Sequence, residues 1–289
     1  MQKGNPMENY EKKGYLKKDF QVFHLYDTEK LDVSCHYHDF DKIILFLGGD
    51  VDYFVEGRRF SLKPYDIILV GAGEIHYPII REKIPYERII LYLSSSFIRN
   101  WRTDTCDLSR CFQEAGENGE KHPYVLRIEN PEQSSLLRIC QELSESFQST
   151  EYAGELYQHA LILEFMVLIN RAILNHQISS LRNAVSNEKI AEILDYINDH
   201  LKEELSVDSL TEHFYMSRSY LMHLFKAETG YSVGSYINEK RLLMAKSMIQ
   251  AGMSVTDACY GCGFRDYSTF SRAFKKKFHT NPRNAVKIR

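Results

Sequence analysis

Two groups of side chains stand at spacings that suit metal ions or small ligands. One residue separates His36 from His38, and His76 follows some forty residues later. Imidazole nitrogens bind divalent metal ions and also hydrogen-bond to polar ligands. Cys259 and Cys262 have the two-residue separation that is found in metal and redox sites. The sequence therefore offers two candidate sites, one in each half of the chain.

The cysteine pair is better explained as part of an apolar helix face. No second cysteine pair or histidine lies near it at the spacing of a zinc finger, and structural zinc sites need four ligands. A buried thiol packs as a small hydrophobic side chain. We therefore expect Cys259 and Cys262 to bind no metal.

The charge of the chain is divided between its two ends. The segment from Ser217 to Arg289 has 13 lysines and arginines against 4 acidic residues, a net charge of +9. The whole chain of 289 residues has a net charge of −3, so residues 1–216 carry −12. This asymmetry predicts an anionic partner for the C-terminal segment, with nucleic acid as the first candidate.

Several classes of protein are excluded by composition. The first twenty residues are polar and lack the apolar core of a secretion signal. The longest apolar stretch, Ala160–Ile169, is interrupted by Glu164 and is shorter than the roughly 20 residues that span a bilayer. Six cysteines in such a chain are typical of reduced thiols in the cytoplasm. We expect a cytoplasmic protein with no membrane contact.

The N-terminal half has the pattern of a small β-structure. Short apolar or alternating runs at 43–47, 51–55, 67–70 and 86–93 are separated by turn residues such as Glu56-Gly57-Arg58. Many short strands at close spacing predict a sandwich or barrel. Residues 1–19 are predicted to be a flexible arm.

Beyond Ser94 the periodicity becomes helical. Residues 136–143 fit one helix face, and residues 156–169 fit a second helix that is apolar on more than one side. Either a partner subunit or a fully buried position would cover that second helix, and the pattern leaves both open. Residues 177–186 have little periodicity and are predicted to be a linker.

The chain from Asn187 onward is predicted to be helical, with two helix-turn-helix units. In the first, a short helix ends near Phe214, and Ser217 can cap the next helix. In the second, Gly263 permits the turn and Asp266 can cap the helix that follows. A helix-turn-helix unit places its second helix in the major groove of DNA.

Residues 187–289 resemble the DNA-binding domain of the AraC family of transcription regulators. The residues that carry the resemblance are Ser219–Lys226, Thr229-Gly230, Tyr236-Ile237, Arg241, Ala245-Lys246, Gly263–Asp266, Phe270–Lys276 and Pro282. The resemblance implies a regulator with no enzymatic activity that binds double-stranded operator DNA.

The same resemblance assigns DNA contacts to the second helix of each unit. Base-edge contacts are implied for Arg218, Ser219, Met222, His223, Ser268, Thr269, Ser271 and Arg272. Arginine can form two hydrogen bonds to guanine, serine and threonine can meet either type of base, and methionine can only touch a thymine methyl. Phosphate contacts are implied for Lys226, Lys240, Lys246, Lys275, Lys276 and Lys277.

Residues 30–93 resemble the cupin-like sensor domain that precedes this DNA-binding module. The matching segments are His36–Ile44, Gly48-Gly49, Pro64–Asp66 and Gly71–His76. The resemblance implies an effector site formed by His36, His38, Lys42, Tyr53 and His76. Metal-binding cupins have a glutamate where this chain has Lys42, and an ammonium group repels a cation. We therefore expect neither a metal nor another cofactor.

Lys42 is expected to point into the barrel. On a regular strand it shares a face with His36 and His38, because side chains alternate with a period of two. A buried ammonium must lose its proton, reach outward or find an anion. Glu74 is a candidate partner inside the protein, and an acidic effector is the alternative.

These observations predict an α+β multidomain protein with four parts. They are the arm at 1–19, a cupin-like β-barrel with flanking helices at 20–176, the linker at 177–186, and an all-α bundle with two helix-turn-helix units at 187–289. The predicted function is that of a transcription activator, a homodimer that works with RNA polymerase and responds to a small effector such as a sugar or sugar acid. Two alternatives stay open: a ligand-independent regulator whose barrel only oligomerises, and a metal-dependent cupin enzyme fused to a DNA-binding module.

Overall fold

The computed structural model describes residues 16, 18–28, 33, 35–81, 85–113, 123–131, 134–147, 149–181, 184–185 and 188–287. The chain divides into two compact units, residues 1–55 with 59–184 and residues 56–58 with 185–289. The predicted arm at 1–19 lies almost entirely outside the described residues.

The first unit is built on two antiparallel sheets. The larger sheet has the order β1-β7-β2-β5-β8-β9 and the smaller the order β10-β4-β3-β6. The strands are β1 Phe20–Asp27, β2 Asp41–Gly48, β3 Val51–Val55, β4 Arg58–Ser61, β5 Ile67–Val70, β6 His76–Ile80, β7 Tyr86–Leu93, β8 Val125–Arg127, β9 Ser179–Ser180 and β10 Ala184–Val185. Two of the shortest strands, β9 and β10, lie in the segment predicted to be a linker. Part of this segment forms β9 because Ser179 pairs with Arg127 of β8 at the edge of the larger sheet.

The central strand β2 has both faces buried. Ile43 and Leu45 belong to one apolar core, whereas Ile44 and Phe46 belong to another. Because neighbouring residues of a strand point to opposite faces, an uninterrupted apolar run indicates a strand that is covered on both sides. Lys42 lies on the same face as Ile44, and it is paired in register with Val70 on β5 and Tyr92 on β7.

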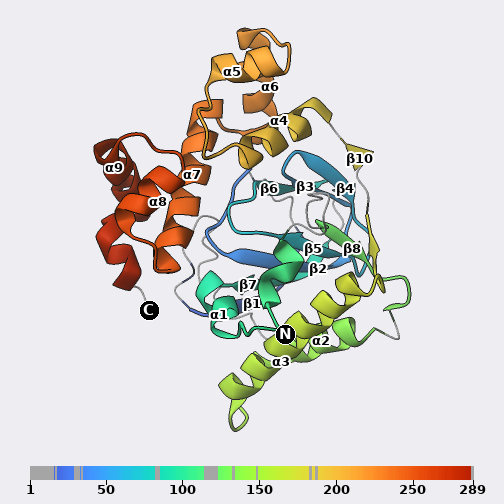
Figure 1. Cartoon of the computed structure of the whole chain (residues 1–289). Coiled ribbons are helices and arrows are strands. Elements are labelled where there is room, and N and C mark those ends of the chain that lie inside the picture. The colour runs from blue at the N-terminus through green and yellow to red at the C-terminus, as the bar shows by residue number, and fades with distance from the viewer. Residues whose placement is uncertain are drawn as a thin grey trace. The chain divides into compact units, whose positions relative to one another are not determined.

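Helices cover the outer face of the larger sheet (Figure 1). They are α1 Ser95–Asn100, α2 Ser135–Ser146 and α3 Gly154–Leu174. The 21 residues of α3 are long and apolar enough to cross a membrane by length and composition, which the interrupted run in the sequence did not predict. Ile162, Phe165 and Ile169 are buried in the core beneath the sheet. These buried residues pack one side of α3 against the sheet.

The second unit is helical, as predicted from the sequence. Its helices are α4 Glu188–Asp199, α5 Val207–His213, α6 Arg218–Thr229, α7 Val233–Gln250, α8 Val255–Gly261 and α9 Tyr267–Phe278. The pairs α5–α6 and α8–α9 are the two helix-turn-helix units, and α7 lies between them (Figure 1). The 18 residues of α7 give it a length of about 27 Å at 1.5 Å per residue.

The core of the second helix-turn-helix unit contains the cysteine pair. Cys259 and Cys262 are fully buried with Phe270 and Phe274. Both thiols are free, and Cys262 Sγ donates to the Cys259 carbonyl oxygen at 3.2 Å. Burial raises the pKa of both thiols, that of Cys262 to about 11. The pair is therefore part of the apolar packing, as the sequence indicated.

Gly263 occupies a turn that has no room for a side chain. Its φ is +93°, a conformation that glycine adopts without strain. A Cβ atom there would lie 2.3 Å from the Leu201 carbonyl oxygen and 2.9 Å from Arg241 Nε. Arg241 Nε itself donates to the Leu201 carbonyl at 2.8 Å, so the turn closes against a fixed backbone group.

We expect Gly263→Ala to lower the free energy of unfolding by about 2–4 kcal/mol, because backbone strain and overpacking each cost about 1–3 kcal/mol. Gly252→Ala is the matched control. Gly252 has a φ of +94°, and a Cβ there would meet nothing within 4 Å. Urea denaturation of both variants separates the effect of backbone strain, which both share, from that of steric overlap, which only Gly263→Ala has. Equal losses of unfolding free energy in the two variants would contradict the steric account.

Candidate functional site

The second helix of the first unit begins with a side-chain cap. Ser217 Oγ accepts a hydrogen bond from the Tyr220 N–H at 3.3 Å, which satisfies one of the free donors at the start of α6. Leu221 and Phe225 are buried on one face of α6. The opposite face exposes four of the residues that were predicted to contact bases and one predicted to contact phosphate: Arg218, Ser219, Met222, His223 and Lys226.

The second helix of the second unit is built in the same way. Asp266 Oδ1 accepts from the Thr269 N–H at 2.7 Å, and hydrogen bonds to the carboxylate lower the pKa of Asp266. Phe270, Phe274 and Phe278 are buried along one side of α9. The predicted DNA-binding residues Ser268, Thr269, Arg272, Lys275 and Lys276 are exposed, and Ser271 is partly buried.

The two exposed faces differ in chemistry. Arg218 forms an ion pair with Asp208, whereas Arg272 Nε donates to the Ser268 carbonyl oxygen of its own helix at 3.3 Å. Met222 on α6 is 47% exposed, and the last turn of α9 carries three lysines. The first helix thus presents an apolar side chain and a paired arginine, while the second presents hydroxyls, an arginine and lysines.

Two tyrosines beside α6 were not singled out by the sequence. Tyr215 is 96% exposed and Tyr220 is 51% exposed. Tyr215 has a φ of +53°, in the same place after the first helix that Gly263 occupies in the second unit. A tyrosine there is strained and a glycine is not. Alignment of the two units on their buried positions would have shown this exchange.

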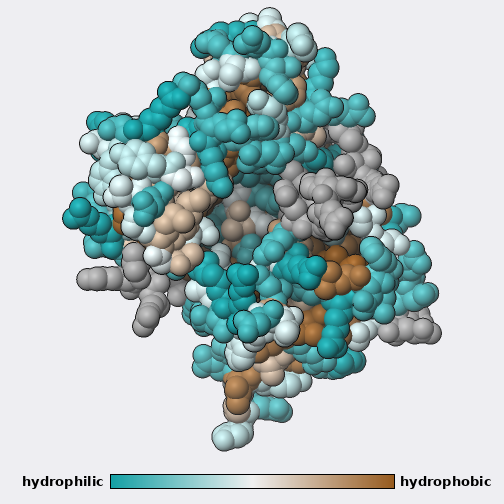
Figure 2. Space-filling model, in the orientation of Figure 1, coloured by the Kyte–Doolittle hydropathy of each residue, from teal (hydrophilic) through white to brown (hydrophobic). Residues whose placement is uncertain are grey.

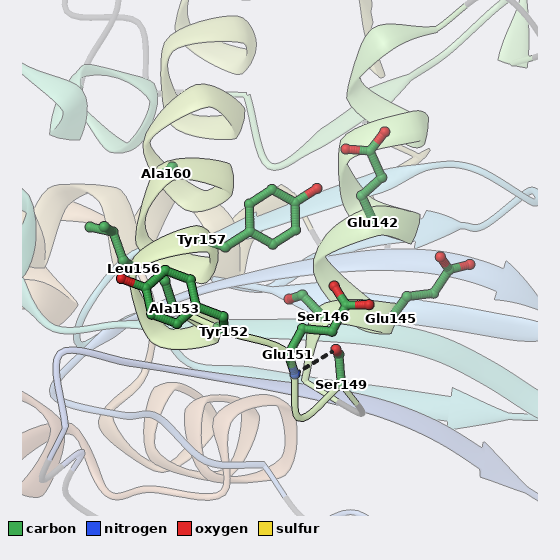
Figure 3. A pocket seen from close by; sticks show the side chains of 11 residues that line it. Glu142, Glu145, Ser146, Ser149, Glu151, Tyr152, Ala153, Leu156, Tyr157 and Ala160 are labelled. Atoms are coloured by element: carbon green, nitrogen blue, oxygen red, sulfur yellow. Dashed lines mark hydrogen bonds between the residues drawn. The ribbon is translucent and has the colours of Figure 1, made fainter.

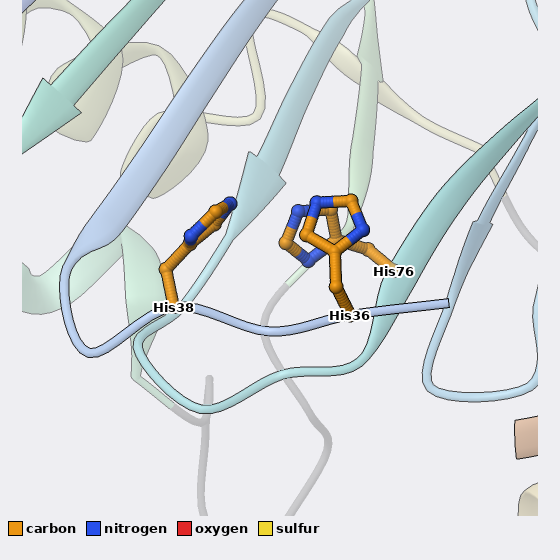
Figure 4. Close-up of side chains that lie close together, drawn as sticks. All are labelled: His36, His38 and His76. Carbon is orange, nitrogen blue, oxygen red and sulfur yellow. The ribbon is translucent and has the colours of Figure 1, made fainter. Parts of the chain in front are cut away.

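The first unit brings together all five residues that were predicted to bind an effector. His36 and His76 face each other in a short bridge, with the His76 N–H donating to the His36 carbonyl at 2.8 Å and the reverse bond at 3.3 Å. Their rings lie 4.5 Å apart, and the His38 ring lies 5.0 and 5.2 Å from them (Figure 4). Lys42 Nζ is 3.3 Å from His76 Nε2 and donates to Tyr53 Oη at 3.4 Å. We call these five residues the nitrogen cluster.

Burial lowers the pKa of three members of the nitrogen cluster, Lys42, His38 and His76. Desolvation, with a smaller effect from Arg88, lowers the pKa of Lys42 from 10.5 to about 7. Desolvation and the charge of Lys42 lower the pKa of His38 to about 2 and hold that of His76 well below 6.5. Removing a charge from water is costly unless an opposite charge compensates for it.

Glu74 is not the partner of Lys42, so that expectation was wrong. Glu74 Oε2 accepts from the Gly71 N–H at 2.6 Å, and Asp41 Oδ1 accepts from the Ala72 N–H at 2.8 Å. Both carboxylates therefore hold the loop that precedes β6. Within the described residues, the hydrogen-bond partners of Lys42 Nζ are a phenol and an imidazole.

The three histidines of the nitrogen cluster fit a divalent cation poorly. One ring nitrogen from each histidine lies within 4.8 Å of the other two, which is close enough to share one ion. However, His76 Nδ1 donates to the Glu74 carbonyl at 2.9 Å, so Nε2 is its remaining ligand atom, and Lys42 Nζ lies against it. A metal would meet an amine at that position and no carboxylate to balance its charge.

Comparison with known proteins agrees with this arrangement. Residues 26–166 match the AraC-like ligand binding domain, and residues 210–287 match a helix-turn-helix domain. The chain belongs to the AraC family of transcription regulators. This AraC-type regulator therefore joins a ligand-binding domain to a DNA-binding domain.

Several known proteins are similar to this chain over most of its length. The HTH-type transcriptional activator RhaS of Escherichia coli (strain SMS-3-5 / SECEC) is 20% identical over 254 residues, which cover 88% of this chain and 87% of RhaS. RhaS of Citrobacter koseri is 21% identical over 86% of both chains. The structure of ToxT from Vibrio cholerae matches 94% of this chain and 99% of its own at 14% identity, with a TM-score of 0.37.

We expect Lys42→Met to raise the free energy of unfolding at pH 7 by about 1–3 kcal/mol. A lowered pKa means that the folded state binds fewer protons than the unfolded state between pH 7 and 10.5, so wild-type stability rises with pH across that range. The full pKa shift of Lys42 sets an upper limit of about 5 kcal/mol on the stability gained by Lys42→Met. The gain is smaller than this limit because the variant also loses the hydrogen bonds of Lys42.

Urea denaturation at pH 7 and at pH 9.5 tests this expectation. The advantage of Lys42→Met should shrink at the higher pH, because wild-type Lys42 then costs less. The exposed Lys63 provides the control Lys63→Met, which should change little at either pH. A pH-independent difference between Lys42→Met and wild type would show that the lysine is not held neutral.

Proposed function

We propose that this protein is a cytoplasmic transcription activator that binds operator DNA as a homodimer and responds to a small effector in its N-terminal domain. The observation that carries the proposal is the pair of capped helices, α6 and α9, each with one face buried in phenylalanines and leucines and the other exposed. A helix built in this way can enter the major groove without disturbing its own core.

The DNA contacts follow from the exposed faces. We assign base contacts to Arg218, Ser219, Met222 and His223 on α6 and to Ser268, Thr269, Ser271 and Arg272 on α9. Lys226, Lys275 and Lys276 are assigned to phosphates, because exposed lysines provide charge without reading sequence. Helix α7 is about 27 Å long and contacts both α6 and α9, and successive major-groove segments on one face of DNA lie about 34 Å apart.

The α2–α3 surface supports the assignment of a dimer. Leu156, Tyr157 and Leu174 of α3 are 71%, 51% and 48% exposed, and Figure 2 shows hydrophobic residues over this part of the surface. A groove of about 710 Å³ is lined by Leu156 and Tyr157, and Tyr157 points between α2 and α3 toward Glu142 (Figure 3). A second copy of α3 would cover these apolar side chains, as clustered exposed apolar residues require.

The regulatory outcome is proposed from the relatives and from the ligand-binding domain. The RhaS proteins are named transcriptional activators, and activation implies RNA polymerase as the partner. The effector site is assigned to the nitrogen cluster, because His36, His38, Lys42, Tyr53 and His76 place polar groups among apolar walls, as ligand pockets do. We assign no enzymatic activity.

Arg272 and Lys276 should affect DNA binding in different ways. On an operator selected by the wild-type protein from a random duplex pool, Arg272→Ala is expected to cost about 1–3 kcal/mol and to relax preference at one base position. Lys276→Gln should weaken binding to every sequence and reduce the salt slope by about one. Fluorescence anisotropy across a salt series measures both. Unchanged affinity and preference for Arg272→Ala would remove α9 from the groove.

Met222 should read a thymine methyl group. Replacing operator thymines one at a time by uracil removes that methyl, and loss of one buried methyl contact costs about 0.8 kcal/mol, or roughly fourfold in affinity. At least one position should show this loss with wild type and lose it with Met222→Ala. A scan in which Met222→Ala keeps every uracil effect would exclude this contact.

A further inference from the structure

The nitrogen cluster lies in the interior of the first unit, between its two sheets. Lys42 comes from β2, Tyr53 from β3 and His76 from β6, while His36 and His38 precede β2. All five side chains are at most 4% exposed. Apolar residues of the same core, such as Phe40 and Tyr92, pack around them.

Three carboxylates on the segments that form the nitrogen cluster have other partners. Asp41 and Glu74 accept hydrogen bonds from the loop backbone, and Asp52 forms ion pairs with Arg59 and Arg81. Arg88 adds to the repulsion felt by Lys42, and its own ion pair is with Asp27. The cluster therefore has a polar interior without a negative charge of its own.

His38 identifies the place where a ligand atom is missing. Both of its ring nitrogens are buried and have no hydrogen-bond partner within the described structure. Its ring stacks on Phe40 at 4.5 Å with an interplanar angle of 16°, so packing holds the imidazole in place. An unsatisfied buried polar group costs about 1–3 kcal/mol, and folded proteins keep such groups where a ligand or ion completes them.

We propose that the nitrogen cluster binds the anionic group, a carboxylate or a phosphate, of the regulator's effector. This inference rests on the proposed function, since it assigns the chemical class of ligand to the effector site. Lys42 Nζ supplies the positive charge, and the ring of His38 supplies a hydrogen bond. An oxygen anion placed between them accepts a hydrogen bond from the imidazole of His38 and compensates the charge of the buried ammonium. A neutral hydroxyl forms a weaker hydrogen bond and carries no compensating charge.

The choice of anion over cation follows from the same contacts. A divalent metal would add positive charge to a cluster that already disfavours it, and Lys42 Nζ stands 3.3 Å from His76 Nε2. An anion instead compensates the positive charge of Lys42. Of the sugar and the sugar acid expected from the sequence, the cluster favours the acid.

The test compares anionic and neutral ligands of matched shape. The full-length protein is titrated by calorimetry with sodium gluconate, glucose and inorganic phosphate at constant ionic strength. Gluconate or phosphate is expected to bind saturably and glucose is not. Lys42→Met should weaken anion binding by at least about tenfold, the value of one hydrogen bond to a charged group. Lys63→Met, an exposed lysine of the same unit, should bind as wild type does.

A second variant and a spectroscopic readout place the ligand. His38→Phe preserves the stacking on Phe40 and removes the orphaned nitrogens, so it should also weaken the anions. With ¹⁵N-labelled histidine, anion binding should shift the His38 imidazole resonances in wild type, and this shift does not depend on the folding of either variant.

Three outcomes would overturn the inference. They are the absence of saturable anion binding in the millimolar range, equal anion binding by wild type and Lys42→Met, and a stoichiometric metal in the purified protein by mass spectrometry. Affinity for the selected operator, measured on the same samples, separates this failure from failure of the proposed function. Intact DNA binding with saturable glucose binding at His38 would keep an effector-responsive regulator and reject only the anion.

Discussion

The fold of the first unit depends on one constraint: both faces of β2 must leave water. Ile43 and Leu45 require a layer of helices on one side, which α2 and α3 provide, while Ile44 and Phe46 require the smaller sheet on the other. Each buried aliphatic side chain of this kind contributes about 1.5–3 kcal/mol. The same alternation carries Lys42 inward with Ile44, so the burial that stabilises the sheets also forces a cationic group into their core.

Under the proposed anion binding, the energetic cost of burying that lysine has a function in the binding site. A methionine at position 42 would fill similar space without desolvating an amine, and His38 would still stack on Phe40. Natural cores rarely contain an ammonium without a carboxylate partner. Lys42 lies near His38, whose two ring nitrogens have no hydrogen-bond partner within the described structure. Binding sites often contain such locally unfavourable groups, and a bound ligand then stabilises the folded state.

The helical unit meets a different constraint, which is that α6 and α9 must both pack against one long helix, α7. Tyr236 on α7 packs edge-on to Phe225 of α6 with ring centroids 5.5 Å apart. Leu242, Ala245 and Ile249 of the same helix are buried with α8 and α9. One continuous helix thus packs in the cores of both helix-turn-helix units. Arg241, bound to the Leu201 and Glu203 carbonyls, further fixes the turn at Gly263.

Much of this arrangement was determined by sequence signals of short range. Ser217 and Asp266 act as the caps that their positions predicted, because a cap and its N–H donor lie three residues apart. The period-two rule placed Lys42 in the interior, and the resemblance to the AraC family identified both domains. Hydrophobic alternation, caps and turn glycines need only neighbouring residues to be interpreted.

Only the tertiary structure decided which distant groups meet. Glu74 was within reach of Lys42 on sequence grounds, yet it folds back on Gly71 because a three-residue turn offers a backbone donor at lower entropic cost. The ion pair of Arg218 with Asp208, the orphaned His38 and the pairing of Ser179 with Arg127 depend on how separate elements pack. Such contacts are fixed by the whole set of buried surfaces together, and no local pattern in the chain records them.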